Sequence, residues 1–155
     1  EMCIRDSPRF ANPTCMTKAI AGYCEETGQP VPETDADFIR CIFESLALRY
    51  NEVIRMLKGM APFRIDRLHV IGGGSKNNLL NQFTANAIGM PVIAGPSEAT
   101  AIGNGMVQAR SAGIVSTRWE MRQLIADSIQ TEIFLPQDET VWKDVYDRYL
   151  QVVKR

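Results

Sequence analysis

The chain has 155 residues, 45% of them hydrophobic, which is enough to bury one ordinary core and fits the size of a single domain. Its 17 Lys and Arg residues nearly balance its 18 Asp and Glu residues, so we expect no binding to nucleic acid or to an anionic membrane surface. No apolar run approaches the roughly 20 residues that cross a bilayer, and no charged-then-apolar signal segment opens the chain, so we expect a cytoplasmic protein.

The first seven residues, EMCIRDS, show no periodicity and begin with Glu. We interpret residues 1–7 as non-native or disordered sequence and expect residues 8–155 to form one domain. A helix is predicted from about Pro13 to Thr27, because Asn12 before a proline is a favourable helix start and Gly28 is a favourable end.

A second, longer helix is predicted next. Thr34 and Asp37 have the spacing of a capping box, and Gly59 and Pro62 are expected to end the helix. Apolar side chains recur between them at three- and four-residue steps, which indicates one buried face. These side chains are Ile42, Leu46, Tyr50, Val53 and Leu57.

The four cysteines and the single histidine do not have the pattern of a zinc site. Cys3, Cys15, Cys24 and Cys41 show no CxxC spacing, and His69 lies in an apolar stretch. Cys24 and Cys41 flank the link between the first two helices, so a disulfide is one alternative, but free thiols are the expected state in a reducing cytoplasm. We interpret His69 as a core or sheet-face residue and not as a catalytic base.

Strands alternate with helices in the rest of the chain. This alternation favours an α/β layer structure with at least two parallel strands. The expected elements are a strand at Leu68–Ile71, a helix from Asn78 to Gly89, a strand at Pro91–Ala94, a helix from Glu98 to Gly113, a helix capped by Thr117 and Glu120, a strand at Gln130–Leu135 and a final helix. Four aromatic residues near the end are interpreted as packing residues: Trp119, Trp142, Tyr146 and Tyr149.

Three consecutive glycines, Gly72, Gly73 and Gly74, separate the first of these strands from its helix. Without Cβ atoms the backbone can adopt positive φ and a ligand can approach it closely. The following helix start offers free N–H groups, which favour a phosphate or another electron-rich group. A nucleotide site and a purely structural tight turn are both consistent with this segment.

A dinucleotide site is a competing interpretation. Gly72, Gly74 and Asn77 form GxGxxN, close to the dinucleotide-binding fingerprint, and Glu98 follows the next strand where a ribose-binding acid would stand. Asn in the third position, the slightly long spacing to Glu98 and the long helix before the motif all argue against it.

The order of motifs is that of a known family. LHVIGGGSKNNLLNQF at 68–83, followed by TANAIGMPVIAGPSEATAIGNGMVQA through Ala109, resembles the adenosine-binding region of the FGGY carbohydrate kinases. The shared pattern is a hydrophobic strand, a GGG turn, a polar stretch with Asn, and later EAT before a glycine-containing helix. The upstream words PRFANP and CIFESLALRY also fit, so the resemblance covers nearly everything after Ser7.

The resemblance implies a ribonuclease-H-like lobe of the actin, hexokinase and Hsp70 type, forming the C-terminal half of a two-lobed sugar kinase. It implies that ATP and a sugar are the partners, with Mg²⁺ held mainly through the nucleotide phosphates and the other lobe. By position, Gly73 lies against the nucleotide, Gly72 and Gly74 permit that approach, and Asn77 faces the adenine with an amide that both donates and accepts hydrogen bonds.

The resemblance also implies what this sequence leaves out. The family's acidic phosphate loop, sugar pocket and catalytic Asp lie upstream, and no DxGT-like or DxGS-like segment occurs here, so we name no catalytic residue and no metal ligand. A kinase of the same family acting on glycerol, a pentulose or gluconate stays open, as does a non-enzymatic nucleotide- or partner-binding domain. We interpret Ser75 as a local cap and Glu98 as a helix-start residue, and assign no role to Gln82 and Asn86.

Overall fold

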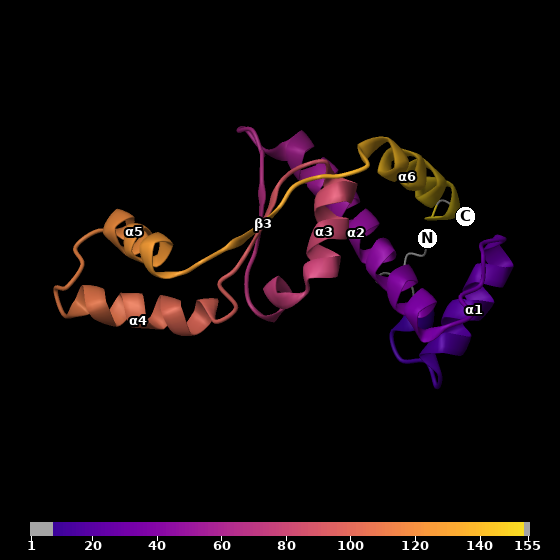
Figure 1. Ribbon diagram of the computed structural model, residues 1–155, viewed down its shortest axis with the longest axis horizontal. Coiled ribbons are helices and arrows are strands. Elements are labelled where there is room, and N and C mark those ends of the chain that lie inside the picture. The colour runs from indigo at the N-terminus through magenta and orange to yellow at the C-terminus, as the bar shows by residue number, and fades with distance from the viewer. Residues whose placement is uncertain (1–7, 154–155) are drawn as a thin grey trace.

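The computed structural model describes residues 8–153 (Figure 1). The interpretation of residues 1–7 as non-native sequence therefore lies outside the described part of the chain. The elements are η1 (Pro8–Phe10), α1 (Met16–Thr27), α2 (Asp35–Met60), β1 (Leu68–Val70), η2 (Gly73–Lys76), α3 (Asn78–Ile88), β2 (Val92–Ala94), α4 (Ala99–Ser111), α5 (Arg118–Ser128), β3 (Glu132–Phe134) and α6 (Glu139–Val153).

The three strands form one mixed sheet in the order β1-β2-β3. β1 and β2 are parallel, as the sequence predicts, and β3 runs antiparallel to β2. One row across the sheet joins Leu68, Val92 and Phe134, and the next joins His69, Ile93 and Ile133. Because side chains alternate between the two faces of a sheet, these two rows point in opposite directions.

One face of the sheet carries the main core. α3 packs on it, and α2 packs along α3 with Ile54 in the same buried cluster as the strands (Figure 1). The α/β class is therefore confirmed, and the burial of this face holds α3 and the start of β1 in fixed relative positions. The buried residues of this cluster are Ile54, Ala85, Ile88, Met90, Val92, Ala94 and Phe134.

The opposite face of the sheet is open. His69 is exposed, which agrees with a sheet-face position, and Ile133 in the same row is 58% exposed. α4 and α5 form an arm on this side that points away from the sheet, and neither of the two helices contains a buried residue (Figure 1). Trp119 on this arm is 71% exposed, so its interpretation as a packing residue is wrong.

The start of α1 differs from the prediction. Pro8–Phe10 form a short 3-10 turn, and the N-cap of α1 is Cys15, three residues after the predicted Asn12. Cys15 makes no side-chain capping bond, so the position is set by the packing of α1 and not by its cap. The predicted end is confirmed, since Gly28 caps α1 in the left-handed conformation.

The predicted capping box of α2 is confirmed. The Thr34 hydroxyl accepts from the Asp37 backbone N–H, and the Asp37 carboxylate accepts from the Thr34 N–H at 3.0 Å. The Thr34 hydroxyl also donates to the Asp37 carboxylate at 2.7 Å, and this bond, together with the one from the Thr34 N–H, holds the pKa of the Asp37 carboxyl below its usual range. Gly59 does not end the helix, which continues to Met60.

A second small core joins α1 to α2. Cys24 is buried in it with Phe10 and Ile20, and Cys41 packs against them. Both thiols are free, as expected, and burial raises the pKa of Cys41 to about 11. A thiol with so high a pKa carries little thiolate at neutral pH and is a poor nucleophile, so we interpret this pair as packing residues.

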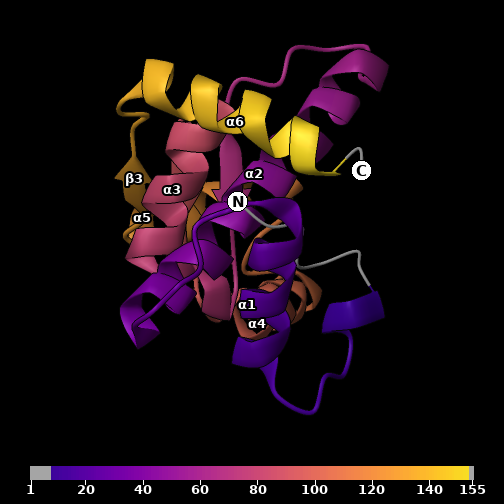
Figure 2. The ribbon, with the colours of Figure 1, turned by 90° about the vertical axis from the view of Figure 1, so that its right-hand side faces the viewer.

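α6 lies across α2 and α3, as the two views show together (Figures 1 and 2). Tyr146 and Tyr149 are buried, and the guanidinium of Arg55 on α2 lies 4.6 Å from the centre of the Tyr146 ring. Trp142 packs against Phe83 with ring centres 5.4 Å apart. These three aromatic residues are packing residues, as predicted. Within residues 8–153, no helix has the length and apolar character needed to cross a bilayer.

Candidate functional site

The candidate site is the turn that follows β1. The backbone leaves the strand, passes through Gly72 at φ 77 and ψ −162, and enters the four-residue 3-10 helix η2. α3 begins only at Asn78, so the glycines do not open the long helix directly. Gly72 donates its N–H to the carbonyl of Pro96 at 3.0 Å, and Gly95 donates to Val70 at 2.8 Å. The turn is thereby tied to the end of the neighbouring parallel strand.

The three glycines differ in whether the backbone or the surrounding atoms require glycine at that position. The φ of Gly72 lies in a region that other residues rarely adopt, so its glycine is required by the backbone. Gly73 has an ordinary φ, and a Cβ placed on it would meet no atom within 4 Å. A Cβ on Gly74 would meet only Val70 Cγ1, at an ordinary 3.8 Å. Neither the fold nor the packing requires Gly73, and the space beside it is open.

Two backbone donors of this segment lack a partner in the turn. η2 uses the N–H of Ser75, which donates to the Gly72 carbonyl at 3.0 Å. Within residues 8–153, the N–H groups of Gly73 and Gly74 have no carbonyl partner, as is usual for the first residues of a helical turn. Both glycines are exposed, so these donors are available to an electron-rich ligand.

Asn77 is the N-cap of α3, directly before the first helical residue, Asn78. Its Oδ1 accepts from the N–H of Leu80 at 3.1 Å. Its Nδ2 group has no hydrogen-bond partner among the described residues and is available as a donor. The amide therefore stabilises its own helix through the oxygen and can bind a ligand acceptor through the nitrogen.

Ser75 and Asn81 support the turn from inside. The Ser75 hydroxyl donates to the Gly72 carbonyl at 2.7 Å, so Ser75 stabilises the glycine turn locally. Asn81 Nδ2 donates to the Ser75 carbonyl at 3.0 Å, and Asn81 is only 2% exposed. Asn81 was not predicted from the sequence. The one feature of the sequence that could have indicated a role for Asn81 is that an amide interrupts the apolar stripe of α3 between Leu80 and Thr84.

Gln82 and Asn86 anchor a different part of the chain. Gln82 Nε2 donates to Asn86 Oδ1 at 2.7 Å and to the carbonyl of Leu135 at 2.8 Å. Asn86 is 8% exposed and also accepts from the N–H of Gln137 at 2.9 Å. These bonds fasten the segment between β3 and α6 to α3, so both residues have a structural role that the sequence did not reveal.

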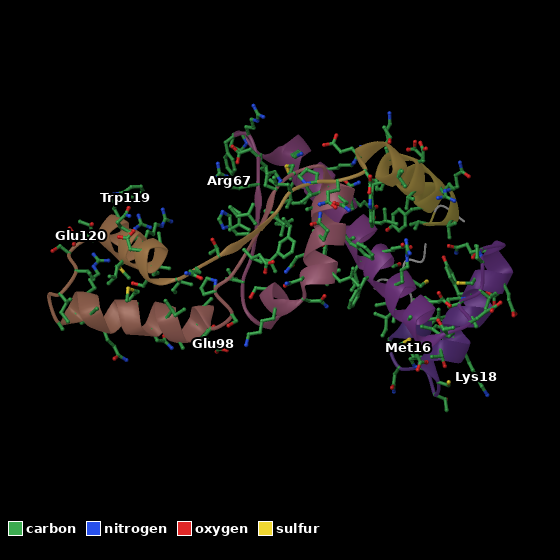
Figure 3. The ribbon with its side chains drawn as sticks, in the orientation of Figure 1. Met16, Lys18, Arg67, Glu98, Trp119 and Glu120 are labelled. Carbon is green, nitrogen blue, oxygen red and sulfur yellow. The ribbon has the colours of Figure 1, made fainter. Side chains whose placement is uncertain are left out.

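Glu98 lies at the end of α4 that is next to the sheet (Figure 3). Trp119 lies on α5, farther from the sheet (Figure 3). Glu98 is the N-cap of α4 but makes no side-chain capping bond. It borders a hollow of about 560 Å³ that Ser75 and Lys76 also line. A second hollow of about 480 Å³, lined largely by apolar side chains of α2, β1 and α3, reaches Gly74 from the other side. The turn is thus bordered by open space on both sides.

The dinucleotide interpretation does not fit this geometry. That fingerprint places the glycines at the start of the helix that receives the pyrophosphate. Here η2 and the Asn77 cap separate Gly72 from α3. The fold and the turn instead define an α/β domain that presents an open glycine backbone at the end of a parallel strand.

The chain belongs to the FGGY family of carbohydrate kinases, because the model of the family's C-terminal domain matches residues 2–112. The match starts within residues 1–7, whose interpretation as non-native sequence stays a prediction.

The chain is similar to rhamnulokinases of several bacteria. The chain is 55% identical over 149 residues to a rhamnulokinase of Bacteroides thetaiotaomicron, covering 96% of this chain and 31% of that protein. It is 40% identical over 141 residues to a rhamnulokinase of Pectobacterium atrosepticum, covering 91% of this chain and 28% of that protein. The chain thus spans less than a third of the length of these curated relatives.

A solved structure shows the same fold. The crystal structure of xylulose kinase from Rhodospirillum rubrum aligns with 81% of this chain and 25% of its own, with a TM-score of 0.61 and 20% sequence identity. This likeness supports the sugar-kinase fold and carries nothing about the substrate.

The two ends of the Asn77 amide give a direct test of its role. Asn77→Asp keeps the oxygen that caps α3 and removes the Nδ2 donor, so we expect little change in thermal stability but weaker ATP binding in the complete enzyme. Loss of one ordinary hydrogen bond costs about 1 kcal/mol, so the ATP Michaelis constant should rise roughly fivefold. Asn77→Ala should do the same and also lower the thermal midpoint.

Steady-state kinetics and thermal denaturation of both variants distinguish a ligand contact from a helix cap. Asn77→Ser is the matched control for the cap, since Ser also caps helices well. An unchanged ATP constant in Asn77→Asp, with a lowered midpoint only in Asn77→Ala, would remove Asn77 from the site.

Proposed function

We propose that the complete protein is an ATP-dependent sugar kinase that phosphorylates L-rhamnulose to L-rhamnulose 1-phosphate. The observation that carries this proposal is the 55% identity to a rhamnulokinase over 96% of the chain. The cytoplasm, where ATP and Mg²⁺ are available, is the corresponding location.

In this proposal the described residues hold the adenosine half of ATP. The exposed backbone of Gly73 and Gly74 lies against the nucleotide, and Gly72 provides the turn that brings it there. The Asn77 Nδ2 donates to an acceptor nitrogen on the adenine edge. These groups bind and orient ATP, and the free N–H groups at the turn favour its electron-rich atoms.

The chemical step needs more than this. Phosphoryl transfer to a hydroxyl depends on an aligned nucleophile, a base and stabilisation of charge on the phosphates, to which Mg²⁺ bound with the nucleotide would contribute. The family's residues for these tasks lie upstream of the segment present here, so we assign the base, the sugar pocket and most Mg²⁺ contacts to that part. The contribution of this chain is to fix where the γ-phosphate points by fixing the adenosine end.

The test is a substrate panel with the complete polypeptide. With ATP and Mg²⁺, we expect kcat/KM for L-rhamnulose to exceed that for glycerol, D-xylulose and gluconate by roughly a hundredfold or more, because a site built to bond several hydroxyls rejects analogues that leave its polar groups unpaired. Coupled detection of ADP and identification of the sugar phosphate measure it. A higher kcat/KM for any of the other three would replace the rhamnulose proposal while keeping the kinase family.

A further inference from the structure

A buried amide connects the core of the domain to the glycine turn. Asn81 lies on the inner face of α3 and is 2% exposed. Its Nδ2 donates to the carbonyl of Ser75, in the middle of η2, at 3.0 Å. The Ser75 hydroxyl in turn donates to the carbonyl of Gly72 at 2.7 Å. A continuous set of bonds therefore runs from the packed helix to the glycine with positive φ.

Packing alone does not explain an asparagine at this position. The next residues on the same face, Thr84, Ala85 and Ile88, are buried against the core, where an apolar side chain is normally favoured. Burying an amide is costly unless it is hydrogen bonded, and the bond that Asn81 makes is to the turn. The benefit of this amide is therefore a fixed position for the Ser75 carbonyl.

The turn needs such a support because little else holds it. η2 is a single 3-10 turn of four residues, whose hydrogen bonds have poorer geometry than those of an α-helix. Gly73 and Gly74 have no side chains to pack and are exposed. Glycine backbones lose more conformational entropy than others when they are fixed. A turn that is already fixed before the ligand arrives does not pay that entropy on binding.

We propose that Asn81 is a positioning residue for the nucleotide: through Ser75 it holds the backbone of Gly73 and Gly74 in the conformation that receives ATP. Asn81 does not itself contact ATP in this proposal. The inference rests on the proposed function, since it assumes that the glycine turn binds the nucleotide.

The test uses the complete enzyme carrying Asn81→Ala. Without the Nδ2 donor the turn is ordered only when ATP binds, so the ATP Michaelis constant should rise about five- to tenfold, while kcat at saturating ATP stays near the original value. The Michaelis constant for the sugar should stay within about twofold, because the substitution loosens only the turn that receives the nucleotide.

Asn86→Ala is the matched control. Asn86 is a buried amide on the same helix, but it bonds to Gln137 and Gln82, away from the glycine turn. It should lower the thermal midpoint as Asn81→Ala does and leave the ATP constant unchanged. A second variant, Ser75→Ala, removes only the hydroxyl bond to Gly72 and should raise the ATP constant by a smaller factor.

The outcomes separate this inference from the proposed function. If Asn81→Ala and Asn86→Ala lower stability alike and affect the ATP constant alike, Asn81 is structural and the inference is wrong. If Asn81→Ala does not fold, Ser75→Ala decides, and an unchanged ATP constant overturns the inference. If Gly73→Val also leaves the ATP constant unchanged, the glycine turn is not the nucleotide site and the proposed function of the turn fails with it.

Discussion

Gly73→Val in the complete enzyme is expected to raise the ATP Michaelis constant roughly a hundredfold, a loss of about 3 kcal/mol of binding, with the sugar constant little changed. Branched carbons would then occupy the open space where the nucleotide meets the backbone. The φ of Gly73 is ordinary and a Cβ there meets no atom within 4 Å, so the free protein should tolerate the change. Isothermal titration with ATP and thermal denaturation of the free enzyme measure the two effects.

Gly72→Ala is the contrasting control. Gly72 has φ 77 and ψ −162, a conformation that costs other residues on the order of 1–3 kcal/mol. This variant should therefore lose stability in the absence of any ligand. If Gly73→Val instead lowers the thermal midpoint as Gly72→Ala does and leaves ATP affinity intact, the glycines serve only a tight turn.

The α/β core could be predicted because its signals are local. The apolar run at Leu68 before the glycines, the capping box of Thr34 and Asp37, and the end of α1 at Gly28 each depend on neighbouring residues only. The predicted start of α1 at Asn12 and Pro13 was wrong. These two residues favour a helix start locally, but tertiary packing overrides that preference.

The candidate site could be predicted only in part. Gly72, Gly73 and Gly74 could be identified from sequence, but periodicity does not reveal which glycine the backbone needs and which leaves space, since that depends on φ and on the surrounding atoms. Asn81 was missed because its role depends on a bond to a carbonyl six residues earlier, across the 3-10 turn.

The arm formed by α4 and α5 limits such prediction for another reason. Its apolar residues have helical spacing, which normally indicates a buried face. Here Val107 of α4 is 60% exposed and Trp119 of α5 is 71% exposed. A sequence pattern reports that a face is apolar and does not report what covers it.

Residues 8–155 alone are expected to show no sugar-dependent ADP formation with ATP and Mg²⁺. A polypeptide extended to the length of the curated relatives should turn over L-rhamnulose at least roughly 10⁴-fold faster, because alignment of the two substrates and a positioned base supply most of the acceleration. This segment corresponds to 31% of the B. thetaiotaomicron protein. The glycine turn binds and orients one substrate but provides neither the base nor the sugar pocket.

Mixing the two parts of the enzyme tests this prediction more strictly than the inactivity of residues 8–155 alone. We expect the separately produced upstream part, mixed with residues 8–155, to restore some turnover, and the same mixture with Gly73→Val to restore far less at low ATP. A titration of residues 8–155 with ATP shows whether the turn is folded, so that inactivity is not mistaken for misfolding. Robust sugar-dependent ADP formation by residues 8–155 without the upstream part would overturn the assignment of the base and the sugar pocket to that part.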